Sequence, residues 1–146
     1  MKATELMIGD LVRVSKDVSI KKGTIVEIRA IDADREFHEL KGCATCVPVD
    51  SPDGLSGGVW VDYLEAIPLT EEILLANGFY YERNIGYVYE GGEYEVIVDL
   101  WNNSYRILHN RDVMMNIQCF SNVLVHELQH ALRHRDVDKE IIIKED

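Results

Sequence analysis

The segment "YVYEGGEYEVIVDLWNNSYRILH" (residues 87–109) decides the fold that we expect for the second half of the chain. Apolar and polar side chains alternate along it, which is the pattern of strands that are buried on one face. Gly91-Gly92 and Asn102-Asn103 interrupt the alternation, and both pairs tolerate the positive φ angles of two-residue hairpin turns. The segment therefore predicts an antiparallel meander of three strands, at residues 87–90, 93–101 and 104–109.

One face of this meander is apolar and must be buried against another element. Residues 121–135 have helical periodicity, with Leu124, Leu128 and Leu132 on one arc and polar side chains on the opposite arc. We expect this C-terminal helix to lie on the apolar face of the meander, which gives an α+β arrangement. On this view His126, Gln129, His130 and His134 lie on the solvated face of the helix.

A short helix is predicted just before the meander. Thr70 can cap its first turn, Glu71 and Glu72 suit the positive end of the helix dipole, and Gly78 can end it in the left-handed conformation. Pro68 and Gly78 mark residues 66–80 as the seam between two subdomains, 1–66 and 67–146.

The first subdomain has the pattern of a small β-structure. Residues 11–14, 24–31 and 59–63 are predicted strands, and the weakly patterned stretch 32–58 has room for one or two more. The Gly-rich residues 51–58 indicate a loop. Short strands with tight turns favour an SH3-like β-barrel for this subdomain.

The string His126-Glu127-Leu128-Gln129-His130 matches the H-E-x-x-H pattern of zinc peptidases. Two histidines four residues apart lie one helical turn apart and can bind the same ion, so His126 and His130 are the candidate metal ligands. Glu127 is the candidate catalytic base that would activate a zinc-bound water. These residues make a minimal zinc-dependent hydrolase one alternative for the function.

A catalytic zinc requires a third protein donor, and the sequence does not supply an obvious one. His134 is too far along the same helix, and Asp138 or Glu140 would serve only if the C-terminal tail folds back. His109 and Cys119 are the other donors to consider.

Three cysteines do not form a disulfide framework, so we expect reduced thiols. Cys43 and Cys46 have the spacing of a zinc knuckle and would make a structural site with His126 and His130 only across a long sequence separation. Cys119 is expected to be a core residue.

The charge and composition exclude several classes of function. The chain has 146 residues and a net charge of −11, which argues against binding to the phosphate backbone of nucleic acids. It has no apolar run of membrane-spanning length and no signal-like N-terminus, so we expect a soluble, cytoplasmic protein without membrane contact. An acidic inhibitor that imitates nucleic acid is a further alternative.

Aromatic residues concentrate around the meander and are candidates for a recognition surface. They are Tyr80, Tyr81, Tyr87, Tyr89 and Trp101. The competing interpretation is that they pack in the core or form cross-strand pairs.

The segments "PLTEEILLANGF" (68–79), "YRILH" (105–109) and "VHELQHAL" (125–132) resemble a group of short uncharacterised proteins of anaerobic gut bacteria and their phages or mobile elements. The resemblance covers most of the chain from Met7 onward and implies no activity. In these proteins the helix that resembles residues 125–132 can read Val-His-Gln-Leu-Gln-Asn, without the Glu and the second His. The resemblance thus implies that the metal motif is a variation on a structural helix.

The resulting hypothesis is a non-catalytic binding or accessory module of phage or mobile-element origin. We expect an unknown protein partner, no nucleic acid and no cofactor unless the zinc alternative holds. Sequence patterns leave the partner and the oligomeric state open.

Overall fold

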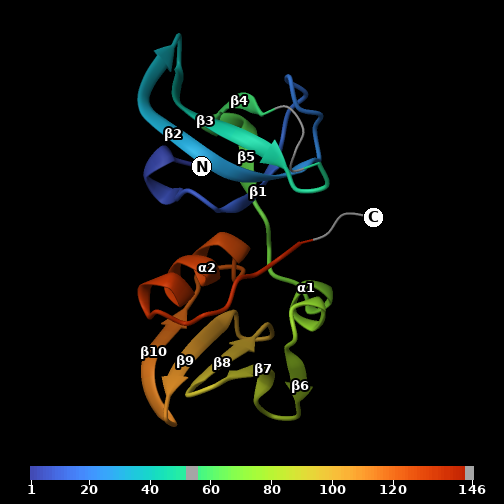
Figure 1. Ribbon diagram of the computed structural model, residues 1–146, viewed down its shortest axis with the longest axis vertical. Coiled ribbons are helices and arrows are strands. Elements are labelled where there is room, and N and C mark those ends of the chain that lie inside the picture. The colour runs from blue at the N-terminus through green and yellow to red at the C-terminus, as the bar shows by residue number, and fades with distance from the viewer. Residues whose placement is uncertain (52–55, 144–146) are drawn as a thin grey trace. The chain divides into compact units, whose positions relative to one another are not determined.

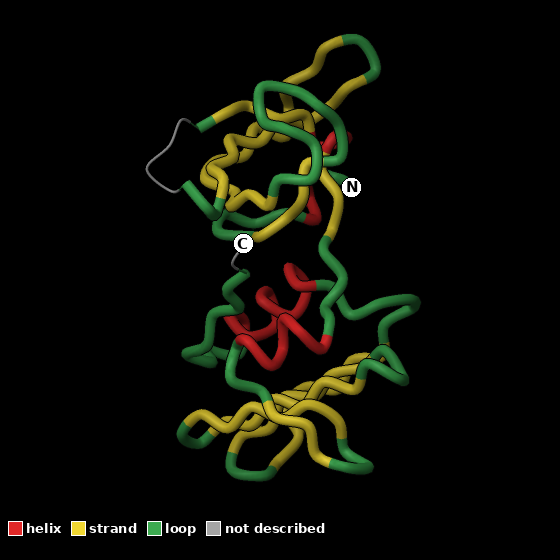
Figure 2. The backbone as a smooth tube through the Cα atoms, turned by 90° about the vertical axis from the view of Figure 1, so that its right-hand side faces the viewer, coloured by secondary structure: helices red, strands yellow, loops and turns green. Residues whose placement is uncertain are grey.

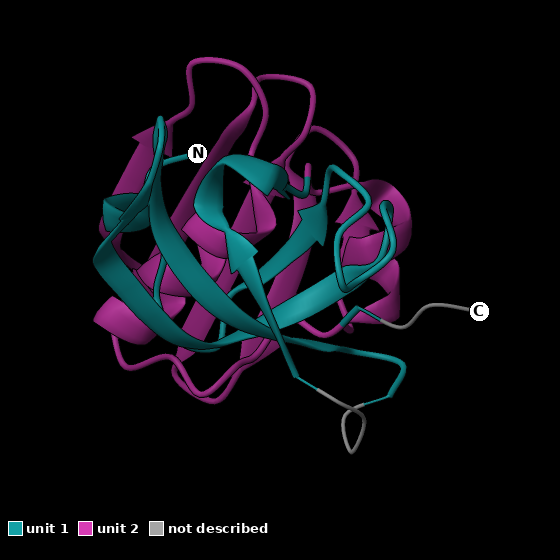
Figure 3. Ribbon diagram, turned by 90° about the horizontal axis from the view of Figure 1, so that it is seen from above, with its two compact units in different colours: residues 1–67, 143–146 teal, residues 68–142 magenta. Residues whose placement is uncertain are grey.

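The computed structural model describes residues 1–51 and 56–143. The chain divides into two compact units, Met1–Ile67 with residues 143–146, and Pro68–Ile142 (Figure 3). The boundary predicted from the sequence lies between residues 66 and 67. Each unit contains one five-stranded antiparallel sheet, and unit 2 also carries the two α-helices. The predicted α+β class is confirmed at this level.

Unit 1 is built on one antiparallel sheet with the strand order β4-β3-β2-β1-β5 (Figure 1). The last strand in sequence thus returns to pair with the first, Val12 lying opposite Ala66. A short 3-10 helix, η2, separates β4 from β5. The elements are η1 (Ala3–Glu5), β1 (Leu11–Val14), β2 (Ile25–Phe37), β3 (Leu40–Pro48), β4 (Gly57–Trp60), η2 (Val61–Tyr63) and β5 (Leu64–Ala66).

Three details of the first subdomain differ from the prediction. The sheet is open, because β4 and β5 are its two edges and do not pair with each other among the described residues. β2 continues to Phe37 instead of ending at residue 31, because its second half is largely exposed and lacks the alternation that predicts a strand. The nine residues of β3, in contrast, are a further strand for which the weakly patterned stretch had room. The third predicted strand stops at Trp60, where the chain turns into η2.

The loop predicted at residues 51–58 falls partly outside the described residues, which omit 52–55.

The core of unit 1 follows from the alternation in its strands. Val12 and Val14 on β1 and Val26 and Ile28 on β2 are fully buried, and Cys46 on β3 is buried with them. All three cysteines are free thiols in the structure.

Unit 2 is a second sheet with the order β10-β9-β8-β7-β6. The three predicted strands correspond to β7, β8 and β9, which confirms the meander, but the prediction of only three strands is wrong. The elements are α1 (Glu71–Ala76), β6 (Tyr80–Glu82), β7 (Gly86–Gly91), β8 (Tyr94–Asp99), β9 (Ser104–His109), β10 (Asp112–Gln118) and α2 (Val125–His134). Sequence patterns missed β6 because it is short, and β10 because it is exposed along most of its length.

Two turns also differ from the prediction. Gly91 still pairs with Tyr94, so the β7–β8 turn is formed by Gly92 and Glu93. Asp99 pairs with Ser104, which leaves Trp101 and its neighbours at residues 100–103 in a four-residue turn instead of a strand.

The C-terminal helix covers one face of this sheet, as predicted (Figure 2). Val96, Val98 and Ile107 point to the covered face and are fully buried, as are Leu128 and Leu132 on α2. The predicted cap of α1 is confirmed, because the Ile73 amide donates to the Thr70 hydroxyl at 3.3 Å. Gly78 has a φ of +85°, the left-handed conformation expected after a helix.

The helices of the described residues are short. None of them has the length and the apolar composition needed to cross a bilayer.

We predict that Cys46 makes the free energy of unfolding decrease as the pH rises in the alkaline range. Burial, and secondarily Cys43, raises the pKa of the Cys46 thiol from 9.0 to about 12. The neutral thiol is therefore favoured in the folded state, and its stabilisation is lost as the pH rises from 9.0 towards 12. Denaturant unfolding over this range should show a flatter pH dependence for Cys46→Ala than for the wild type. Cys43→Ala, which removes a partly exposed thiol, is the matched control and should keep most of the pH dependence, because burial is the larger cause of the shift. An unchanged slope in Cys46→Ala would contradict the prediction.

Candidate functional site

The H-E-x-x-H string lies on α2, but its side chains are not distributed as the helical wheel predicted. His126 and Gln129 are buried, with 4% and 5% of their surface exposed, whereas Glu127 is exposed. The prediction of a solvated polar face is therefore wrong for His126 and Gln129. The wheel considers one helix alone, and at Gln129 it omits a chain segment that lies against this side of the helix.

That segment is the C-terminal tail, which folds back within unit 2. The Ile141 amide donates to Gln129 Oε1 at 2.7 Å, and Gln129 Nε2 donates to the Lys139 carbonyl at 3.3 Å. Gln129 thus binds the backbone of the tail as a neighbouring strand would. Gln129, the second x of the H-E-x-x-H pattern, therefore has a structural role.

A second buried amide binds the next residue of the tail. Asn77, at the end of α1, accepts a hydrogen bond from the Ile142 amide at 2.7 Å. Its Nδ2 group donates to the carbonyls of Ile142 at 2.8 Å and Ile73 at 2.7 Å. Asn77 and Gln129, which we call the amide clamp, hold the tail against both helices of unit 2.

The two candidate metal ligands lie side by side. The imidazole rings of His126 and His130 have their centroids 5.5 Å apart, with an angle of 78° between the ring planes. The helical spacing correctly predicts that these two rings are neighbours. It does not supply the further donors that a metal site needs.

The other candidate donors do not join this pair. Although the tail folds back, Asp138 and Glu140 are exposed. His109 contacts Glu93, with 2.9 Å between Nε2 and Oε2. Within residues 1–51 and 56–143, no cluster of three or more His, Cys, Asp or Glu side chains is placed to hold a metal ion.

Glu127, the candidate base, lies near two other groups. Burial raises the pKa of the Cys119 thiol and that of Tyr105, the latter to about 12, and the negative charge of Glu127 adds to both shifts.

The described residues therefore place two imidazoles together without a third donor beside them. This donor set does not fit a catalytic zinc.

A different site lies at one end of the sheet, where the β6–β7 turn meets the β8–β9 turn. The two turns enclose a hollow of about 460 Å³. Trp101 and Tyr81 line it and are 93% and 61% exposed. Tyr87 also lines it, with its ring centroid 5.3 Å from that of Tyr81. We call this site the aromatic hollow.

The turn that carries Trp101 is held by one carboxylate. Asp99 Oδ1 accepts hydrogen bonds from the amides of Trp101 at 3.0 Å and Asn102 at 3.1 Å, and Oδ2 accepts one from Asn102 Nδ2 at 2.8 Å. Gln118 Nε2 donates to the Asn102 carbonyl from the neighbouring β10. The indole is therefore presented on an ordered turn.

A polar hollow of about 440 Å³ adjoins the first and shares Ile85, Asp99 and Asn102 with it. Its other lining residues include Ser104, Arg106, Asn116 and Gln118. The hydrogen-bonding groups of this hollow thus lie directly beside the aromatic side chains of the first.

The aromatic residues singled out in the sequence do not form a single surface. Tyr80 donates to Glu90 at 2.8 Å. Tyr89 packs against Phe79, with ring centroids 5.5 Å apart, and under Lys139. Only Tyr81, Tyr87 and Trp101 line the aromatic hollow. The sequence signal for the exposure of Trp101 is Asp99 two residues before it, since such residues form side-chain turns.

The fold and this hollow define an α+β protein of two units with an aromatic surface site. No family model, no curated protein and no solved structure matches the chain.

The amide clamp should contribute measurably to stability. Gln129→Ala leaves the Ile141 amide and the Lys139 carbonyl without their side-chain partner, and we expect a loss of about 2 kcal/mol in the free energy of unfolding. Chemical denaturation measures this loss, and amide hydrogen exchange at Ile141 should accelerate. Glu127→Gln, an isosteric change of an exposed neighbour, should alter stability little. Equal effects of the two substitutions would contradict a structural role for Gln129.

We predict that the protein, purified without a histidine tag and reconstituted with zinc, retains less than one zinc ion per chain after gel filtration. Two imidazoles bind zinc weakly without further donors. Elemental analysis measures the metal content. Retention of one zinc per chain that is lost in both His126→Ala and His130→Ala would overturn this prediction and restore the hydrolase alternative.

Proposed function

We propose that the protein is a non-catalytic binding module that holds a protein partner at the aromatic hollow, and that it is of phage or mobile-element origin. The origin rests on the sequence resemblance alone. The binding role rests on the hollow, and above all on the exposure of Trp101.

Trp101 supports the proposal because a tryptophan that is 93% exposed has no role in the core of its own chain. Its turn is ordered by Asp99, so little conformational entropy is lost when a partner covers the indole. Tryptophan and tyrosine are also the side chains that most often dominate the energy of protein interfaces. An ordered, exposed Trp beside two Tyr side chains is therefore suited to anchor a partner.

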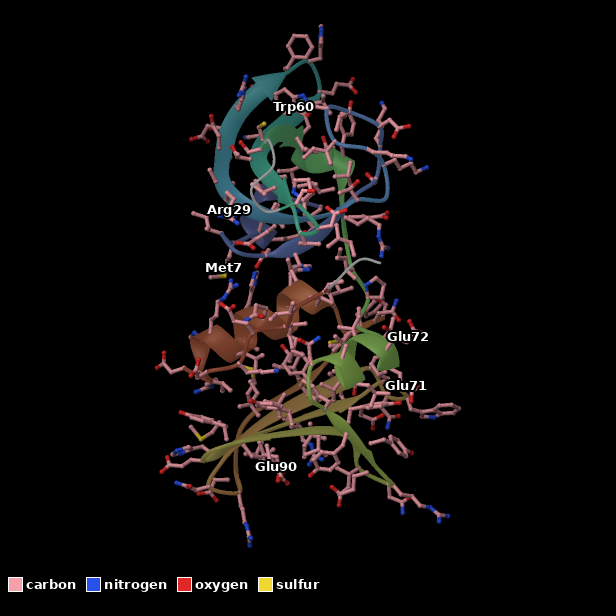
Figure 4. All side chains as sticks on the ribbon, turned by 45° about the vertical axis from the view of Figure 1, so that its right-hand side comes forward. Met7, Arg29, Trp60, Glu71, Glu72 and Glu90 are labelled. Carbon is pink, nitrogen blue, oxygen red and sulfur yellow. The ribbon has the colours of Figure 1, made fainter. Side chains whose placement is uncertain are left out.

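The charge of the chain indicates the chemistry of that partner. A net charge of −11 attracts a basic surface and accelerates the encounter with it. Unit 2 carries exposed carboxylates at Glu71 and Glu72 on α1 and at Glu90 on β7 (Figure 4). Aromatic faces additionally favour Lys and Arg side chains through cation–π contacts. We propose a basic polypeptide as the partner.

Unit 1 is proposed to be an SH3-like half-open barrel. The support is its strand order, in which four antiparallel strands pair in sequence and the fifth returns to pair with the first. This assignment concerns the fold and carries no function.

Substituting Trp101 should test the binding role directly. The expected result is that the wild type retains a basic protein from the lysate of an anaerobic gut bacterium, and that Trp101→Ala weakens this binding by roughly tenfold or more, the effect of truncating an interface hot spot. Titration by calorimetry measures the affinity once the retained protein is purified.

Phe37→Ala is the matched control, because Phe37 is an exposed aromatic residue of unit 1. The control should bind as the wild type does. A retained partner that is insensitive to Trp101→Ala would contradict the proposed surface. Displacement of the partner by DNA would favour the alternative of an acidic inhibitor that imitates nucleic acid.

A further inference from the structure

The strand β10 forms one edge of the sheet in unit 2, and it pairs only with β9 among the described residues. With seven residues it is longer than the other three edge strands, β4, β5 and β6, which have four, three and three. An edge strand presents unpaired amides and carbonyls that can pair with another strand. Proteins commonly prevent this with short edges, Lys or Pro. β10 is not short and contains neither residue.

Apolar side chains concentrate along this edge. Val113, Met114 and Ile117 are 55%, 43% and 38% exposed, and Phe120, the second residue after the strand, is fully exposed. A row of exposed apolar side chains on an unpaired edge marks an interaction surface. The opposite edge differs, because β6 ends at Glu82 and is followed by Arg83.

The charge of the segment indicates which partner the edge suits. Residues 111–120 contain one positive side chain, Arg111, and one negative side chain, Asp112, so the segment is neutral in a chain of net charge −11. An edge that receives a basic partner would be expected to share the negative charge of the chain. A neutral edge instead allows two identical chains to approach there without direct repulsion between like charges.

The register of β10 allows self-pairing. Met115 and Ile117 lie opposite Ile107 and Tyr105, on the face that the helix covers, while Asn116 lies opposite Arg106 on the other face. An irregularity between Val113 and Met115 interrupts the first part of the strand. The regularly paired part is therefore residues 115–118. A twofold axis perpendicular to a sheet passes through a single residue of the paired strand, and Asn116 is a residue of this part on the face away from the helix.

Antiparallel pairing about this residue places Asn116 opposite Asn116 of the second copy. Met115 then lies opposite Ile117, on the same face, and Met114 lies opposite Gln118. Beyond the regular part, Asp112 lies opposite Phe120. No like charges face each other, and two apolar pairs form across the dyad.

We propose that β10 pairs with β10 of a second copy of this chain, antiparallel about Asn116, so that the two sheets of unit 2 become one continuous sheet. This inference does not depend on the aromatic hollow. The proposed pairing buries a modest area, so the dimer should dissociate on dilution. Because both chains carry a net charge of −11, added salt should strengthen the association.

The experiment exploits the position of Asn116 on the twofold axis. Asn116→Lys places two lysines opposite each other, and Asn116→Asp places two carboxylates opposite each other, so each variant alone should be monomeric in sedimentation equilibrium. Mixed in equal amounts, the two variants should form a heterodimer, because a lysine of one chain then lies opposite an aspartate of the other. The wild type should show a dimer whose population rises with concentration and salt.

Asn122→Lys and Asn122→Asp are the matched controls, since Asn122 is also exposed in unit 2 but lies outside β10. They change the net charge equally and should dimerise as the wild type does. Circular dichroism verifies that all variants fold. A monomeric wild type across the micromolar range, dimeric Asn116 variants, or a mixture that stays monomeric would each overturn the proposal.

Discussion

Unit 2 depends on covering one face of an open antiparallel sheet. Val96, Val98 and Ile107 are fully buried on that face, and their burial provides the main driving force for docking α2. A ten-residue helix is marginal by itself in water, so it gains its stability from this contact. The amide clamp then fixes the tail over the polar side of the helix. The tail therefore requires α2 in place, and α2 requires the apolar face of the sheet.

The packing of α2 between the sheet and the tail changes how the H-E-x-x-H residues are interpreted. Gln129, one of the two residues that the motif leaves unspecified, makes the structural hydrogen bonds, and Glu127, the residue that catalysis would require, is exposed. His126 is buried beside His130, as a ligand pair would be, but a helix supplies only two donors at this spacing. The string is better explained as part of a helix that packs on the sheet and also binds the C-terminal tail.

The surface of unit 2 has two features that its own folding does not require. Asp99 accepts hydrogen bonds that order the turn and leave Trp101 in solvent, and β10 leaves one edge of the sheet unpaired among the described residues. The first offers an aromatic anchor beside polar groups, and the second offers backbone hydrogen bonds along a neutral segment. They differ in chemistry, and they suit different partners.

Local patterns in the sequence determined the elements whose side chains alternate between core and solvent. These were β1, the central meander and α2, together with the capped helix α1, because burial of one face leaves a period in the sequence. Tertiary structure alone decided the rest. β10 is exposed along most of its length and has no such period, and the open sheet of unit 1 depends on pairing between distant strands. The burial of Gln129 depends on a tail ten or more residues away, since hydrogen bonds to a distant backbone leave no mark in local sequence.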